Sequence, residues 1–300
     1  MKGKNEAPWI YYEYATGLIS ITYYGWHPAI ALIVVGFTRV LDYVYDFYQF
    51  RGRERRTAVT AALAVPTAQL RPMLTDSQVV YGVGVSVILV DTLEQSVSRM
   101  DTTLYFTSAR LADADAFMRV YVDLELEPAE RVVYRLVVRD AFDPRTGALY
   151  GGPIPLRNFR ADRIEVSDVV LTRPDAGQWT RSGLTFALTP AQSFRIGEPI
   201  TIFYEIYNLP GDTPYRTEIR VVPAMRGLVD RLADLVTPGS RSLRVSFEGA
   251  TPVAGGPVRE VRTLQGGLRP DDYEIEVTVT DLLTGARATA SSLMTLVEVE

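Results

Sequence analysis

The chain has 300 residues, of which 47% are hydrophobic and 22% are charged, a balance typical of a folded chain long enough for two ordinary domains. The formal net charge of -5 argues against nucleic acid as a partner of the whole molecule. Because the chain has no cysteine, disulfides, thiolate metal sites and cysteine nucleophiles are excluded.

The first residues do not follow the pattern of a cleaved signal peptide. Residues 1–5 are mildly basic, but Glu6 and Pro8 follow directly. No small-residue cleavage site closes a compact apolar region. We therefore expect no cleaved signal peptide here.

Residues 14–38 form an uncharged, largely apolar stretch. Its length of about 25 residues is sufficient for a membrane span. Tyrosine and tryptophan side chains cluster around it, and these residue types favour the boundary between membrane and water. The residues that we expect to contact a membrane or partner in this region are Trp9, Tyr11, Tyr12, Tyr23, Tyr24, Trp26, Ile33 and Phe37.

Pro28 divides this stretch, because proline disfavours helix at the preceding residue and suits the first turn of a new helix. Ala29–Phe37 is wholly apolar, and Arg39, Asp42 and Asp46 then recur at helical spacing. The pattern predicts an apolar helix that becomes amphipathic toward its end. Three placements remain open: one kinked span, a re-entrant or interfacial helix, and a helix buried in the rest of the protein.

The pattern then changes to the alternation of β-strands. Tyr45–Phe50 and Thr57–Val65 predict two strands joined by a polar turn, RGRERR. The basic residues Arg53, Arg55 and Arg56 are candidates to contact acidic lipid or a partner surface. The alternative is an ordinary solvated loop.

Alternating apolar residues continue to the end of the chain and predict short strands separated by turns. The predicted strands are Val79–Val90, Thr102–Thr107, Arg119–Glu127, Arg131–Arg139, Ile164–Leu171, Leu184–Leu188, Ile200–Tyr207, Arg216–Val222, Leu243–Phe247, Tyr273–Thr280 and Ala288–Val297. This spacing indicates antiparallel β-sandwich architecture. Apolar residues at helical spacing predict one short helix near 225–236.

The sequence therefore predicts a mainly β protein with three parts. Residues 1–44 are an apolar, aromatic-rich helical anchor, followed by two antiparallel, immunoglobulin-like β-sandwich units. The first unit covers residues 45–160, and the second covers residues 161–300 and includes the short helix.

Three passages resemble the β-rich C-terminal region of bacterial GWxTD-domain proteins. They are Phe47–Pro66, Phe194–Pro223 and Gly267–Ala290, and the likeness lies in the order of strands and turns over most of residues 45–300. The GWxTD motif is missing, since GWHPA at 25–29 departs from it at the Thr and Asp positions. The helical domain that normally precedes the β part is also absent. The resemblance implies an envelope-associated β domain, with no active-site residues to carry over.

Chains of this architecture also look like membrane-extrinsic supporting subunits of bacterial energy-transducing assemblies. Photosynthetic reaction-centre–antenna complexes are one example. This likeness concerns architecture and rests on no single residue.

The sequence offers no catalytic set. His27 is the only histidine and lies in the apolar stretch, away from the strand loops that carry sites on β-sandwiches. We therefore predict that the protein is not an enzyme and has no cofactor. For His27 we expect a structural role at a turn; the alternative is a ligand of a metal or of a pigment magnesium.

Two further patterns have both a functional and a structural interpretation. The pairs Asp113 with Asp115 and Asp140 with Asp143 could bind calcium, but their spacing is not that of an EF-hand and favours turn capping. The aromatic residues Trp179, Tyr204 and Tyr207 could stack on a sugar or belong to a sandwich core.

These observations lead to a functional hypothesis. We expect a non-enzymatic structural subunit that docks on a membrane protein complex and holds its subunits together, using buried aromatics and charged rims. The complex could be a photosynthetic reaction centre with its light-harvesting antenna. Its expected location is the membrane of the bacterial cell envelope; the side stays open, with the periplasmic face preferred. The alternative is a membrane-tethered envelope module that binds glycan or another ligand.

Overall fold

The protein is mainly β. The computed structural model describes residues 37–159, 163–173, 179–181, 183–224, 242–253 and 256–298, and the backbone of 13–15 and 18–20. Helical structure in these ranges is limited to two 3-10 turns, Arg53–Arg55 and Thr67–Gln69. A membrane-spanning helix, judged by length and hydropathy, does not occur in the described part of the chain. The predicted helix near 225–236 lies outside it.

The contacts divide the chain into two compact units, each made of segments that are separate in the sequence. Unit 1 comprises residues 1–43, 65–118 and 132–154. Unit 2 comprises residues 44–64, 119–131 and 155–300. Each unit is described below by itself.

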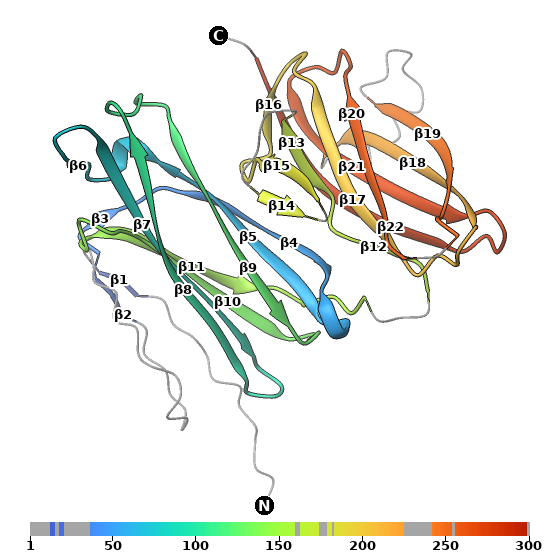
Figure 1. Ribbon diagram of the computed structural model, residues 1–300, viewed down its shortest axis with the longest axis horizontal. Helices are drawn as coiled ribbons and strands as arrows, with labels where there is room; N and C mark the ends of the chain where they lie inside the picture. Colours follow the sequence, from blue (N-terminus) through green and yellow to red (C-terminus); the bar gives the residue numbers. More distant parts are fainter. Residues whose placement is uncertain are drawn as a thin grey trace, which may run out of the picture. The chain divides into compact units, whose positions relative to one another are not determined.

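Unit 1 is built on one sheet (Figure 1). In spatial order its strands are β3 (Arg39–Val40), β11 (Thr146–Pro153), β10 (Val132–Asp140), β7 (Val79–Asp91) and β6 (Met73–Leu74), with β8 (Val97–Ser108) also paired to β7. All pairs are antiparallel except β3 with β11. Two further strands, β1 (Glu13–Ala15) and β2 (Leu18–Ser20), form a separate antiparallel pair.

The alternation of β7 explains its central place in this sheet. Tyr81, Val83 and Val85 are buried on one face, as expected for a strand whose apolar residues recur with period two. Gly82 and Gly84 lie between them on the opposite face. A Cβ atom on Gly82 would lie 3.0 Å from the Tyr105 ring, so glycine allows this close approach.

Unit 2 contains three sheets (Figure 1). The first has the order β4 (Val44–Arg51), β5 (Thr57–Pro66) and β9 (Phe117–Leu126). The second, called the middle sheet here, has the order β12 (Glu165–Val166), β17 (Ile200–Tyr207), β13 (Val170–Arg173), β15 (Leu184–Leu188) and β14 (Trp179–Arg181), with β20 (Val258–Leu264) also paired to β17. The third has the order β16 (Ser193–Arg195), β22 (Arg287–Val297), β21 (Asp271–Asp281), β18 (Pro214–Pro223) and β19 (Leu243–Ala250).

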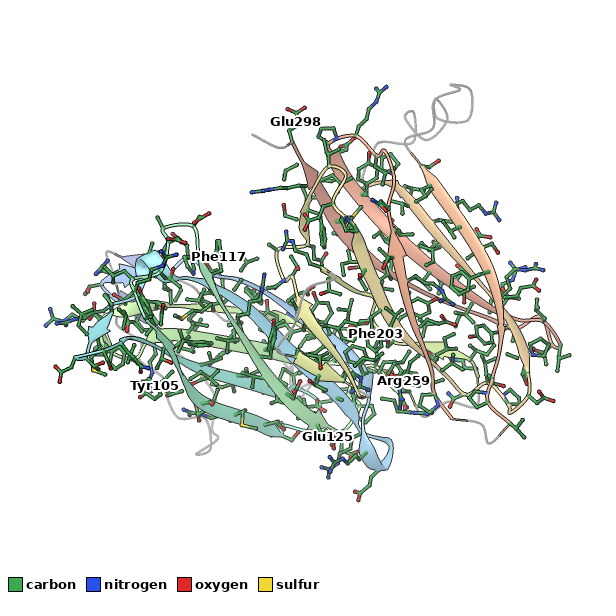
Figure 2. The ribbon with its side chains drawn as sticks, turned by 45° about the horizontal axis from the view of Figure 1, so that its top comes forward. Tyr105, Phe117, Glu125, Phe203, Arg259 and Glu298 are labelled. Carbon is green, nitrogen blue, oxygen red and sulfur yellow. The ribbon has the colours of Figure 1, made fainter. Side chains whose placement is uncertain are left out.

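β17 is buried on both faces, and all eight of its residues are buried. Ile202 and Tyr204 belong to a core shared with residues of the third sheet, such as Val277. Phe203 points to the other side and packs in a second core with Phe50 of β4. Figure 2 shows Phe203 in the interior of this unit. Two buried faces explain why the sequence ITIFYEIY is almost continuously apolar.

The strands predicted from strict alternation are confirmed. Arg119–Glu127, Arg131–Arg139 and Tyr273–Thr280 correspond to β9, β10 and β21 within three residues at each end. The predicted pair at Tyr45–Phe50 and Thr57–Val65 corresponds to β4 and β5. These matches establish a mainly β protein built of several sheets.

The helix predicted to continue to residue 47 is wrong over its described part. Arg39–Val40 and Val44–Arg51 are strands, and Glu13–Ala15 and Leu18–Ser20 nearer the N-terminus are strands as well. The helical spacing of Arg39, Asp42 and Asp46 does not decide the structure here. Instead, β4 pairs with β5 over eight residues, and this pairing fixes an alternating register. Residues 21–36 lie outside the description.

Candidate ligand cleft

An open cleft of about 680 Å³ lies at one end of unit 2. Three sheets or their connections contribute to it. It is lined by Asp46, Phe47 and Tyr48 of β4, Asp168 and Val169 before β13, Pro190, Ala191 and Gln192 before β16, Glu274 of β21, and Ser291, Ser292 and Leu293 of β22. The cleft therefore brings together residues that are far apart in the sequence.

Asp46 is the most unusual group in this cleft. Its carboxylate accepts hydrogen bonds from the Phe47 backbone N–H (2.8 Å) and from Gln192 Nε2. Burial, reinforced by the nearby Asp168, raises the pKa of Asp46 from 3.8 to about 6, although the two hydrogen bonds and the neighbouring Tyr48 hydroxyl oppose the shift. No ion pair joins Asp46 to any described residue.

Tyr48 lies beside Asp46 in the cleft lining. The side chain is only 2% exposed, and its hydroxyl makes no hydrogen bond of regular geometry with a described residue, although Asp46 and Gln192 lie close enough to act on its pKa. Burial first, and then the charge of Asp46, raise the pKa of this hydroxyl well above its usual value. The group is therefore a neutral hydrogen-bond donor at the cleft wall.

Asp168 is held differently from Asp46. It accepts a hydrogen bond from Gln49 N (2.7 Å), and Arg157 Nη1 lies 3.0 Å from its other oxygen. Burial raises the pKa of Asp168, and Arg157 opposes the shift. Its charge thus has a cation beside it.

Gln192 is fixed by its backbone. Its φ of 48° is in the left-handed region that non-glycine residues seldom occupy. Its N–H donates to Thr189 O (2.8 Å) and its carbonyl accepts from Thr295 N (2.9 Å). These bonds hold the strained residue in place so that its side-chain amide reaches Asp46.

The side chains that line the cleft are carboxyl, hydroxyl, amide and apolar groups. Hydroxyl groups are present, but its lining contains no histidine, lysine or cysteine to activate a nucleophile. No set of three or more metal-binding side chains occurs among the residues that the structure describes. What the cleft offers is carboxylate charge, hydrogen-bond donors and apolar walls.

Sequence reasoning did not single out Asp46, because it treated this residue both as the last charge of a helix and as part of the predicted strand Tyr45–Phe50, and in neither role as a binding residue. A signal was present in the stretch VYDFYQF, where one acidic residue interrupts an aromatic strand. A carboxylate at such a position is surrounded by apolar groups unless a partner reaches it. The partner residues are distant in sequence and could not be predicted.

Most of the predicted interaction residues lie outside the described part of the chain. This holds for Trp9, Tyr11, Tyr12, Tyr23, Tyr24, Trp26 and Ile33, and also for His27. Phe37 is described, and its ring is buried against Gly147 in unit 1. Its side chain is thus part of the unit's packing.

The basic turn after β4 is exposed and paired with acidic residues. Arg53 has a side chain that is 90% exposed, 4.0 Å from Glu125. Arg56 lies 3.2 Å from Glu127. The side chain of Arg55 lies outside the description. These contacts are those of a solvated loop that pairs with β9.

The structure shows where the aromatic residues and one of the two aspartate pairs lie. Trp179, Tyr204 and Tyr207 are at most 3% exposed, so they form no sugar-stacking surface. Asp140 accepts hydrogen bonds from two backbone N–H groups of its own turn, at Phe142 and Asp143.

A buried ionic cluster lies elsewhere in unit 2. Glu205 of β17 is 2% exposed, and Arg181 Nη2 lies 2.9 Å from its carboxylate. The Tyr207 hydroxyl donates a hydrogen bond of 2.5 Å to the same carboxylate and accepts one from Arg51 N (3.1 Å). Arg181 also lies over the Phe50 ring, 4.2 Å from its centroid. In this cluster the Glu205 carboxylate has both a cation and hydrogen-bond donors, and Arg181 Nε is the one atom of the cluster that is buried without a hydrogen-bond partner among the described residues.

β8 in unit 1 is the second feature of functional interest. None of its twelve residues is buried, and it pairs with β7 alone among the described strands. Val97, Met100 and Tyr105 are exposed large apolar residues on it. Figure 2 shows Tyr105 at the surface of unit 1.

Comparisons with known proteins do not assign a family. No family model matches this chain. No curated protein matches it.

The solved structures that match do so only distantly. Red sea bream transglutaminase is 9% identical at a TM-score of 0.24, over 87% of this chain and 32% of that chain. A calcium-binding mutant of Bacteroides uniformis β-glucuronidase 2 is 9% identical at a TM-score of 0.27, over 84% of this chain and 28% of that chain. Activated Escherichia coli α2-macroglobulin is 12% identical at a TM-score of 0.24, over 81% of this chain and 26% of that chain. The chain spans at most 32% of these proteins, and these likenesses carry no argument about function.

Proposed function

We propose that this chain is a non-enzymatic structural subunit that docks on a membrane protein complex and holds its subunits together. The single observation that supports this proposal is the exposed edge strand β8. A photosynthetic reaction-centre–antenna complex is one assembly of the proposed kind. Docking of this type requires a surface and no reacting groups.

β8 has the properties of a strand-pairing surface. It is twelve residues long, and unpaired N–H and C=O groups along an edge strand favour addition of a further strand. Natural monomers block such edges with charged residues, proline or a bulge, whereas β8 has neither lysine nor proline and its two charged residues, Arg99 and Asp101, pair with each other. We propose an extended strand of a complex subunit as its occupant.

The remaining parts of the proposal follow the sequence. The predicted anchor of residues 1–44 is limited here to residues 1–36, because Leu41 and Tyr43 are buried in unit 1; residues 1–36 would attach the chain to the membrane of the bacterial cell envelope, with the periplasmic face preferred. The body would consist of two immunoglobulin-like sandwiches, 45–160 and 161–300, related to the β part of GWxTD-domain proteins. Limited proteolysis tests this division: after a cut near residue 160, two fragments that separate and stay folded would support it, whereas fragments held together through residues 44–64 and 119–131 would contradict it.

Substitutions on β8 test the docking proposal. We expect Val97→Lys with Met100→Lys to abolish comigration with a large membrane complex after detergent extraction and size-exclusion chromatography, with mass spectrometry to identify the partners. The added charges should oppose strand addition without unfolding unit 1, since both positions are exposed. The matched control is Leu283→Lys, at an exposed apolar position in unit 2. Equal comigration of both variants would contradict docking through β8.

The attachment is tested by truncation after residue 36. The deletion must stop there, because Leu41 is fully buried and the Tyr43 hydroxyl donates to Leu136 O (3.0 Å) within unit 1. If the truncated chain still fractionates with membranes or the complex, residues 1–36 are not the attachment.

A second candidate function is a membrane-tethered envelope module that binds glycan or another ligand. The cleft at Asp46 favours it, because polar groups that converge beside apolar walls are the usual form of a ligand site. Retardation of a lone chain on polysaccharide gels would support this function over docking.

A further inference from the structure

The cleft of unit 2 is acidic. Its lining contains three carboxyl groups, on Asp46, Asp168 and Glu274, and neither lysine nor arginine. Asp168 has Arg157 beside it, 3.0 Å away, whereas Asp46 is in no ion pair with a described residue. The cleft therefore favours a cation from outside, because a partly buried carboxylate lacks compensation there.

The Tyr48 hydroxyl is a second sign of a missing ligand. It is buried at the cleft wall and makes no hydrogen bond of regular geometry with a described residue. Buried polar groups are nearly always paired in folded proteins, so an unpaired one beside a cleft points to a group that the cleft receives.

The walls of the cleft determine which kind of cation fits. Phe47, Val169 and Leu293 supply apolar surface beside the carboxylates, together with Pro190 and Ala191. A hydrocarbon chain packs on such surface while its charged end reaches the carboxylate. A divalent metal ion needs more oxygen ligands than the described side chains gather there.

We propose that this cleft binds an organic cation, an alkylammonium or guanidinium group, with its charge against Asp46 and its hydrocarbon stem on the apolar wall. The Tyr48 hydroxyl donates a hydrogen bond to a polar atom next to the charged group. The cation comes either from a free amine or from a lysine or arginine side chain of another polypeptide. The inference rests on the second candidate function, which it narrows to one ligand class, and is independent of docking through β8.

The test uses small probes and the full chain in detergent. n-Butylammonium and n-butylguanidinium are titrated against 1-butanol, their neutral counterpart, and observed by NMR at the Phe47 amide and the Gln192 side-chain amide. End-blocked Gly-Lys-Gly and Gly-Gln-Gly distinguish the polypeptide source from the free amine. We expect saturable shifts with the cations alone, and tighter binding of the lysine peptide than of n-butylammonium if the ligand is a polypeptide.

Variants then locate the site. Asp46→Asn keeps the shape of the side chain and should weaken binding at least about tenfold, because a charge-assisted contact is lost. Tyr48→Phe should weaken binding of the peptide a few-fold through the lost hydroxyl. The matched control is Glu248→Gln, an exposed carboxylate of β19 paired with Arg216, which should bind like the unaltered chain.

Each opposite result overturns the inference. It fails if 1-butanol shifts the same signals as n-butylammonium, if Asp46→Asn binds equally well, or if no cationic probe saturates the signals. It also fails if calcium chloride alone saturates them at lower concentration than any organic cation. Because comigration with a complex and retention on polysaccharide gels are measured separately, failure here is distinguishable from failure of either proposed function.

Discussion

Glu205 on β17 and Asp46 on β4 are carboxyl groups withdrawn from water within the same unit, but only Glu205 has a cation beside it. Arg181 and Tyr207 surround the Glu205 carboxylate and satisfy it. Asp46 has two hydrogen-bond donors and no cation among the described residues. The difference separates a structural carboxylate from a candidate binding carboxylate, since only an uncompensated charge gains from a ligand.

The largest expected change in stability comes from removing the cation beside Glu205, which leaves that carboxylate unpaired as Asp46 is. Arg181→Ala should lower the free energy of unfolding by about 3–5 kcal/mol, because it leaves a buried carboxylate without its cation. Urea unfolding at pH 7, followed by circular dichroism, measures the loss.

Two further variants check this explanation. Adding Glu205→Gln to Arg181→Ala should recover more than half of the loss, because it removes the uncompensated charge. Arg216→Ala breaks an exposed pair with Glu248 and should change stability by less than about 1 kcal/mol. A loss as large at Arg216 as at Arg181 would refute the role assigned to burial.

The next largest change in the free energy of unfolding is an increase rather than a loss. Asp46→Asn should raise the free energy of unfolding by about 1–3 kcal/mol at pH 7.5, because Asp46 is ionised there against the cost of burial. Asparagine can still accept the hydrogen bond from the Phe47 N–H, and Gln192 can turn its amide to face it.

The pH dependence follows from the raised pKa. Between pH 3.8 and about 6 the folded state holds a proton on Asp46 that the unfolded state has lost. The contribution of Asp46 to stability therefore falls as pH rises through this window, and the gain from Asp46→Asn should vanish near pH 4. The groups around Asp46 are Tyr48, Asp168 and Glu274, so unfolding is measured for both chains at each pH and only the difference is used. A gain that persists at pH 4 would contradict burial of the charge as its cause.

The sequence predicts these two sites unequally. Regular alternation predicted β9, β10 and β21, because each buries one face and exposes the other. The buried strand β17 was also predicted, but the sequence could not show that Glu205 within it has a partner 24 residues earlier.

The cleft could not be predicted for the same reason. Its lining comes from β4, β21, β22 and two connections, and their meeting depends on packing of whole sheets. The helical spacing of Arg39, Asp42 and Asp46 favoured a helix, and only strand pairing places Asp46 on the cleft wall. Local pattern gives the strands, whereas the site depends on tertiary contacts.

Tyr207→Phe removes one of the hydrogen bonds that hold Glu205. We expect a loss of about 2 kcal/mol, because the hydroxyl donates to a buried carboxylate and accepts from Arg51 N. Thermal and urea unfolding should agree on this value. A loss below about 0.5 kcal/mol would show that Arg181 alone compensates Glu205.

The smallest effect is expected for the matching change at Tyr48. Tyr48→Phe should leave the free energy of unfolding unchanged or raise it by up to about 1 kcal/mol, because the hydroxyl is buried without a hydrogen bond of regular geometry to a described residue. Urea unfolding of this variant beside Tyr207→Phe compares the same atom lost from two buried tyrosines. A loss at Tyr48 as large as at Tyr207 would mean that its hydroxyl is already satisfied within the folded chain. No ligand would then be needed to pair it, and the distinction drawn between the two carboxylates would lose one of its supports.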